Sequence, residues 1–317
     1  HSVFSRAIVT AMRNSGYFQV VRTVASEAEA DLLIEEGEAQ FVVTIPEGFS
    51  RRLVRGERPA LLLTADATDP SATSNALAAF RIFSETALAR DLEGPLHHLR
   101  RSGPPLDIIV HARFNPEGIT QYNIVPGLMG VVLTMTLVII TALAITRERE
   151  RGTMENLLST PVKPLEVMLG KIVPYIIVGY VQMGVILLAG RYLFHVPMLG
   201  NLLLLLFVSL PFIAANLGVG LTFSTLARNQ LQAVQMAFFF FLPSILLSGF
   251  MFPFRGMPLW AQRIGEILPL THYLRIVRGI ILKGNSIPQI LPNLWPIGIF
   301  LLVALSIGLT RYHRTLD

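Results

Sequence analysis

The sequence predicts an α-helical polytopic membrane protein with a small α/β domain outside the membrane. Only 15% of the 317 residues are charged and 52% are hydrophobic, whereas a soluble domain usually has about 25% charged residues. Residues 1–122 hold 12 basic and 15 acidic residues, whereas residues 123–317 hold 14 basic and 6 acidic residues. The first part therefore has a soluble composition, and the second, with its long apolar runs, has the composition of a membrane domain.

Residues 1–122 alternate between helical and extended patterns, which predicts the α/β domain. Helical periodicity, with Ser26 as an N-cap, predicts helices over residues 3–14, 27–36, 47–55 and 72–100. β-branched and alternating segments predict strands over residues 18–23, 39–45, 61–65 and 106–114. Asp66 and Asp69, with neighbouring hydroxyls, suit either a cation-binding loop or the capping of the next helix, and capping is the favoured interpretation.

The apolar runs of residues 123–317 are long enough to cross a membrane. A bilayer core about 30 Å thick needs roughly 20 apolar helical residues. The runs predict spans near residues 124–146, 171–194, 199–226, 231–251 and 290–311. A soluble protein would need an implausibly large core to bury five such helices, so residues 123–317 are predicted to form a transmembrane domain.

The basic residues predict the orientation of these spans. The segment 147–171 between the first two spans carries Arg147, Arg149, Arg151, Lys163 and Lys171, and the tail carries Arg311 and Arg314. The positive-inside rule places both in the cytoplasm. The basic segment 253–289 falls on the other side, where its prolines and aromatic residues predict short interfacial or re-entrant helices. Residues 1–122 are then extracytoplasmic, and a sixth span is expected before residue 1.

The composition and motifs exclude several kinds of site. The chain has no cysteine, which rules out thiolate metal sites, disulfides and cysteine nucleophiles. No G-x-x-x-x-G-K-[ST] loop occurs in the sequence, which excludes ATP binding by a P-loop. The isoelectric point of about 9.8 comes from basic residues beside apolar runs, so we expect no nucleic acid partner. We also expect no catalytic residue and no metal site.

The segment RERERGTMENLLSTPVKPLEVMLGK, residues 147–171, contains more than a simple connector needs. Gly152 separates the Arg-rich end of one helix from Thr153, a candidate N-cap, and Glu155 falls in the first turn, where the helix dipole favours an anion. The apolar residues of this short helix recur at i, i+3 and i+4 and form one stripe, made of Met154, Leu157 and Leu158. Two prolines, Pro161 and Pro164, end this helix and begin the next.

This segment resembles the intracellular loop of ABC-2 type transporter permeases, which contains their coupling helix. The resemblance extends to FNPEGITQYNIVPG (114–127), LARNQLQAVQ (226–235), LPSILLSGFMFP (242–253) and LPLTHYLRIVRGIILKG (268–284). It covers nearly the whole chain and is strongest to the bacterial drug-efflux branch of the family. The large outer domain after a first helix is a further point of similarity.

The resemblance implies the permease subunit of an exporter in the bacterial inner membrane, driving ATP-powered efflux of a drug-like or lipophilic substrate. It implies coupling to a separate ATPase, present in two copies, through Gly152, Thr153, Met154, Glu155, Asn156, Leu157 and Leu158. ATP and Mg would bind that partner, and this chain would bind no cofactor. A second permease copy or paralogue, membrane lipid and a periplasmic adaptor are the other expected partners.

Polar, aromatic and methionine side chains within the spans are candidates for a substrate path. The selected residues are Met129, Asn216, Gln235 and Phe238. Each could instead face lipid or a neighbouring helix, and intramembrane amides often bond across helices. Drugs, lipids, polysaccharides and sodium ions all remain open as substrates.

Two other functions are compatible with a polytopic chain. A secondary transporter usually places charged residues at the membrane midplane and often contains internal repeats, and neither feature occurs in this sequence. A membrane receptor with an outer sensor domain would need a cytoplasmic output domain, but the largest cytoplasmic piece is the segment 147–171. Both alternatives therefore rank below an exporter permease.

Overall fold

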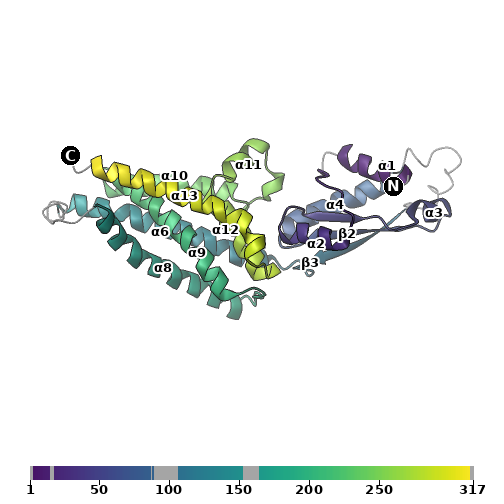
Figure 1. Ribbon diagram of the computed structural model, residues 1–317, viewed down its shortest axis with the longest axis horizontal. Helices are drawn as coiled ribbons and strands as arrows, with labels where there is room; N and C mark the ends of the chain where they lie inside the picture. Colours follow the sequence, from purple (N-terminus) through teal and green to yellow (C-terminus); the bar gives the residue numbers. More distant parts are fainter. Residues whose placement is uncertain (1–2, 15–17, 87, 89–105, 153–163, 315–317) are drawn as a thin grey trace. The chain divides into compact units, whose positions relative to one another are not determined.

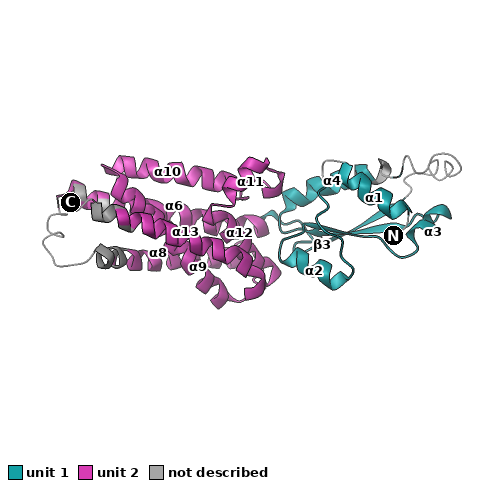
Figure 2. Cartoon of the chain, turned by 45° about the horizontal axis from the view of Figure 1, so that its top comes forward, with its two compact units in different colours: residues 1–120 teal, residues 121–317 magenta. Residues whose placement is uncertain are grey.

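The computed structural model describes residues 3–14, 18–86, 88, 106–152 and 164–314. The chain divides into two compact units, residues 1–120 and residues 121–317 (Figure 2). Each unit has its own hydrophobic core.

The first unit is a small three-stranded sheet with helices on both faces (Figure 1). Its strands are β1 (Phe41–Thr44), β2 (Ala60–Asp66) and β3 (Asp107–Arg113). In the order β1-β2-β3, the first pair is antiparallel and the second is parallel. Its described helices are α1 (Val3–Asn14), α2 (Glu27–Glu35), α3 (Phe49–Val54) and α4 (Pro70–Thr86). These elements confirm the predicted small α/β domain.

The core of the first unit forms where α1, α3 and α4 meet the sheet. Its fully buried members include Ile8, Leu53, Leu61, Leu63 and Phe80. The Phe18 ring packs edge-on against Phe80, with ring centroids 5.8 Å apart.

The strand predicted over residues 18–23 is wrong. Phe18 and Val20 pack against the core, but Val21 is 70% exposed, and the segment pairs with no strand in the described part of the chain. The alternation of residues that suggested a strand therefore reflects a segment held by the packing of Phe18 and Val20 and by the ion pair of Arg22 with Glu29, 2.8 Å apart. For the helix predicted over residues 72–100, the structure gives α4 up to Thr86, and residues 89–105 lie outside the described residues.

The capping predictions in this unit are confirmed. Ser26 Oγ accepts a hydrogen bond from the Glu29 N–H at 3.2 Å. Asp69 Oδ1 accepts from the N–H groups of Ser71 and Ala72 at 3.1 and 3.3 Å, and thereby caps α4. Asp66 Oδ1 instead accepts from the N–H and the hydroxyl of Thr68, at 3.1 and 2.7 Å, in the turn before α4. Of the two aspartates, Asp69 is therefore the one that caps the helix.

Five described helices of the second unit are long and apolar enough to cross a membrane. They are α6 (Thr120–Glu150), α8 (Pro164–Tyr192), α9 (Leu202–Leu226), α10 (Gln230–Leu247) and α13 (Ile287–Arg314). All five predicted spans are therefore confirmed as helices, and the chain is a polytopic membrane protein.

Short helices connect α10 to α13, as the prolines of this segment predicted. They are η2 (Phe254–Gly256), α11 (Leu259–Gly265), α12 (Pro269–Arg278) and the π-helical turn η3 (Gly279–Lys283). Most of α12 is buried against the spans. The charge of Arg275 is paired within this segment, because its guanidinium donates to both carboxylate oxygens of Glu266 at 2.7 and 3.2 Å.

Aromatic and hydroxyl contacts fix α12 against α9. The Tyr273 ring lies flat on Phe212, with ring centroids 3.8 Å apart and planes 2° apart. The Tyr273 hydroxyl lies 2.8 Å from Ser209 Oγ. All three side chains are fully buried, so this contact is a fixed point of the second unit.

Candidate functional site

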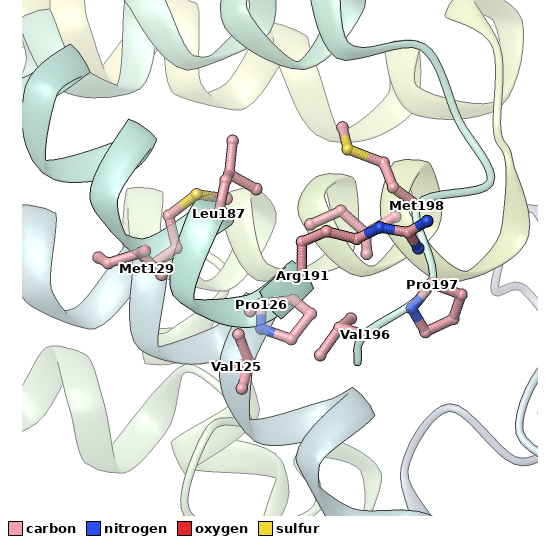
Figure 3. Close-up of a pocket in the computed structure, with 11 residues that line it drawn as sticks. Val125, Pro126, Met129, Leu187, Arg191, Val196, Pro197 and Met198 are labelled. Atoms are coloured by element: carbon pink, nitrogen blue, oxygen red, sulfur yellow. The ribbon is translucent and has the colours of Figure 1, made fainter. Parts of the chain in front are cut away.

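A cavity of about 320 Å³ lies beside the first turns of α6 and the last turns of α8 (Figure 3). Its walls come from α6, α8, the segment that follows α8, and η3. The residues that line it are Val125, Pro126, Met129, Ile186, Leu187, Gly190, Arg191, Val196, Pro197, Met198 and Ile281. The cavity has the size and the mainly apolar lining of a small-molecule site.

The turn after α8 shapes the mouth of this cavity. His195 has a φ of +54°, and the N–H of Val196 donates to the Gly190 carbonyl at 2.9 Å. The N–H of Leu199 donates to the Ile281 carbonyl at 3.0 Å, which joins the turn to η3. These backbone hydrogen bonds hold the segment that carries Pro197 and Met198 beside α8.

A close helix approach forms the inner wall. A Cβ atom added at Gly190 would lie 2.9 Å from Val125 Cγ1, so only glycine fits this contact without a shift. Pro126, in the first part of α6, has no N–H to donate to the preceding turn. Met129, one turn further along α6, is fully buried and lines the pocket.

Among the described residues that line the cavity, Arg191 is the only charged one. It is exposed, and it reaches from α8 toward the segment with Pro197 and Met198 (Figure 3). Within the described residues, no acidic side chain pairs with it, whereas Arg275 is paired with Glu266 and Arg113 with Asp31. The cavity is therefore an apolar pocket with one positive charge at its mouth.

The four residues predicted for a substrate path do not converge in the structure. Met129 lines the pocket, but Asn216 is buried within α9, where its amide donates to the Phe212 carbonyl at 2.9 Å. Gln235 and Phe238 are exposed on α10, three residues apart and so on one helix face. Whether any of the four residues borders a substrate path stays a prediction.

The sequence analysis did not select Arg191. A basic residue at the end of an apolar span usually marks the membrane interface, so its position alone did not indicate a site. The turn that follows, with Val196, Pro197 and Met198, offered a further signal, because an apolar segment with a proline must pack on something. The contribution of Ile281 depends on tertiary structure and had no sequence signal.

The opposite end of α6 leads into Gly152, the first of the predicted coupling residues. Gly152 is exposed and has a φ of +69°, a conformation that favours glycine. The last regular hydrogen bond of α6 runs from the Arg151 N–H to the Arg147 carbonyl. Gly152 therefore ends the helix as the sequence predicted. The other predicted coupling residues, Thr153, Met154, Glu155, Asn156, Leu157 and Leu158, lie outside the described residues.

The end of α6 is joined to the turn between α9 and α10. Glu150 accepts hydrogen bonds from the backbone N–H of Gln230, at 2.8 Å, and from its side-chain amide. One turn earlier, the Thr146 N–H donates to Ser224 Oγ at 3.2 Å. The Gln230 hydrogen bonds lower the pKa of Glu150, the side-chain amide contributing most.

The described residues contain no group of three or more histidines, aspartates or glutamates placed to hold a metal ion. The polar groups of the pocket and of the α6 end are instead suited to hydrogen bonding and to charge recognition.

Comparisons with known proteins agree on one family. The family model for ABC-2 family transporter proteins matches residues 1–310. The chain is 32% identical over 293 residues to the probable multidrug ABC transporter permease YbhS of Escherichia coli K12, covering 90% of this chain and 75% of the relative. It is 30% identical over 295 residues to the probable multidrug ABC transporter permease YbhR of the same strain, covering 93% and 78%. It is 27% identical over 326 residues to the inner membrane transport permease YhhJ of that strain, covering 99% and 83%.

Proposed function

Because this chain belongs to the ABC-2 family of transporter proteins, we propose that it is the permease subunit of an exporter powered by a separate ATPase subunit. The family relationship and the five apolar helices account for a multi-pass membrane permease. The direction of transport, the coupling segment and the kind of substrate do not follow from the family relationship alone and are part of the proposal.

The joint between Glu150 and Gln230 is the observation that carries the coupling proposal. It holds the connection after α6 and the connection between α9 and α10 at the same end of the unit. Basic residues lie at both connections: Arg147 in the last turns of α6, Arg151 directly after it, and Arg228 between α9 and α10. We assign this end to the cytoplasm, as the positive-inside rule favours.

The coupling segment would begin directly after Gly152. A left-handed glycine allows the chain to leave the axis of α6 sharply, and Glu150 fixes the last turn from which it leaves. A force applied to residues 153–158 would then reach α6 and α10 together. This is the mechanical connection that an exporter needs between ATP hydrolysis and its spans.

ATP and Mg would bind the partner, since this sequence contains no P-loop. Two ATPase copies would act with two permeases, either two copies of this chain or this chain and a paralogue. The permease would lie in the inner membrane of a bacterium. Residues 1–122 would lie on the extracytoplasmic side, where a periplasmic adaptor could contact them.

We propose a drug-like or lipophilic compound as the substrate. Two relatives carry the words probable multidrug ABC transporter permease in their names. The mainly apolar cavity beside Met129 also suits a lipophilic molecule better than a polysaccharide or a sodium ion, which need many polar contacts.

ATP hydrolysis by purified components tests the division of labour. The isolated chain, free of other proteins, is expected to hydrolyse no ATP, and the complex with its ATPase is expected to hydrolyse ATP faster when a lipophilic substrate is added. Robust hydrolysis by the isolated chain would contradict the proposal.

A further inference from the structure

We propose that the pocket between α6, α8 and η3 binds an amphiphile with an anionic head group. Its apolar part would fill the cavity beside Met129 and Leu187, and its charge would pair with Arg191. The role of this pocket in export rests on the proposed function, but binding to it does not.

The lining of the cavity favours an apolar group inside it. Of the residues that contribute, Met129 is fully buried, and Val125, Val196 and Ile281 are at most 9% exposed. A hydrocarbon chain or ring placed against them would leave water for apolar contacts, which is the main source of affinity in such sites.

The charge at the mouth favours an anion. A guanidinium stays protonated at every physiological pH, and its planar fork matches the oxygens of a carboxylate, sulfonate or phosphate. Arg191 has no acidic partner within the described residues, so an anionic head would not have to displace one. A lipophilic cation would instead meet a like charge at the entrance.

Arg275 provides a contrast within the same unit. Its guanidinium is neutralised by Glu266 and lies over the Phe254 ring, 4.7 Å from the centroid. These contacts explain Arg275 as a structural residue of the segment between α10 and α13. Among the described residues Arg191 has no comparable ion pair, and an anionic ligand would supply one.

The binding geometry exists before a ligand arrives. The hydrogen bond from Val196 to Gly190 fixes one side of the mouth, and the hydrogen bond from Leu199 to Ile281 fixes the other. A preformed site avoids the ordering cost that weakens binding to mobile segments.

Two sources could supply this chemistry: an exported amphiphile, or an anionic lipid of the surrounding bilayer. Both have an acidic head and an apolar tail, so the same pocket would recognise either. The composition of the bilayer separates them, because lipid competition depends on the lipid head group.

Fluorescence binding to the intact permease in phosphatidylcholine nanodiscs tests the proposal. The probes are a dansyl-labelled fatty acid and its uncharged methyl ester. The acid is expected to bind about tenfold more tightly than the ester, since one charge-assisted contact is worth roughly 1.4 kcal/mol. Arg191→Gln should remove this preference, and Arg191→Lys should keep part of it.

Leu187→Trp serves as the matched control for the cavity. It fills the pocket and leaves Arg191 in place, so both probes should lose affinity together. Thermal unfolding of each variant checks that the helices remain folded. Equal binding of acid and ester to the wild type, or an unchanged preference in Arg191→Gln, would overturn the proposal.

Adding phosphatidylglycerol to the nanodiscs identifies the source. Displacement of the acid by this lipid assigns the pocket to a bilayer head group, and undiminished binding assigns it to a transported amphiphile. ATP-driven transport measured in parallel separates the two proposals. Lost acid preference with intact transport contradicts only the anion site, whereas absent transport with intact binding contradicts only the exporter function.

Discussion

Glu150, the last residue of α6, accepts hydrogen bonds from both the backbone N–H and the side-chain amide of Gln230, the first residue of α10. The two residues are 80 positions apart in the sequence. One carboxylate therefore ends one span and caps the start of another, immediately before the segment proposed to couple to the ATPase.

The joint predicts a pH-dependent contribution to stability from Glu150. Its folded-state pKa is lowered, so the contribution is present at neutral pH and is lost as the pH falls through that lowered pKa. Glu150→Gln should lower the melting temperature at neutral pH and make little difference in strong acid. Thermal unfolding of the wild type and of Glu150→Gln, from neutral to strongly acid pH, measures the difference between their melting temperatures.

Glu117→Gln is the control for that experiment, because Glu117 is also exposed. It should leave the melting temperature unchanged at each pH. A difference between wild type and Glu150→Gln that stays constant from neutral to strongly acid pH would show that the charge of Glu150 does not stabilise the joint.

Gly220 sets the distance between α9 and α6. A Cβ atom added there would lie 2.6 Å from the Val138 carbonyl oxygen and 2.8 Å from Thr141 Cβ. Gly220→Ala should therefore destabilise the protein by about 1–3 kcal/mol through overpacking. Gly298→Ala on α13 is the matched control, because nothing lies within 4 Å of its Cβ position. Equal unfolding free energies for the two variants would refute the close contact.

The Ser209–Tyr273 pair predicts an asymmetric double-mutant cycle. Ser209 also bonds to the Leu205 carbonyl, at 2.7 Å, so Tyr273→Phe leaves it a partner and should cost about 1 kcal/mol. Ser209→Ala leaves the buried Tyr273 hydroxyl without this partner and should lower the unfolding free energy by more. The double variant should be about as stable as Tyr273→Phe alone. Additive losses in unfolding experiments would argue against this hydrogen bond.

Cysteine labelling tests the proposed orientation. The chain has no cysteine of its own, so single cysteines at Ser71 and Ser159 give an unambiguous signal. An impermeant thiol reagent should label Ser71→Cys from outside the cell and Ser159→Cys only after the membrane is opened. Labelling of both cysteines from the same side would contradict the proposed orientation.

The spans were predictable because a run of about twenty apolar residues matches the thickness of a bilayer and rarely occurs elsewhere. The first residue of a span was predicted less accurately where a polar side chain caps the helix and so determines where it begins. Asn201 caps α9 by accepting from the Leu203 N–H at 2.8 Å, so the helix begins at Leu202 rather than at the predicted residue 199. Pro164 begins α8, as the two prolines of the segment had indicated.

The candidate pocket was largely beyond sequence reasoning. Met129 was selected for its residue type within a span; it lines the cavity, and its place on a substrate path stays a prediction. Arg191 and Ile281 meet only because the turn after α8 bonds to η3, a contact between residues more than 80 positions apart. Periodicity describes one helix at a time, so it could not bring these segments together.

The most direct test of the account is whether Leu157 couples the permease to its ATPase. Leu157→Asp would bury an unpaired carboxylate at the subunit contact, which costs several kcal/mol, and Leu157→Met is the control that keeps the apolar surface. The measurement is substrate-stimulated ATP hydrolysis by the purified permease–ATPase complex, with the melting temperature of each permease. We predict that Leu157→Asp loses the ATPase and its stimulation while the permease keeps its melting temperature and Leu157→Met keeps both. Full ATPase binding and stimulated hydrolysis with Leu157→Asp would contradict the coupling proposal.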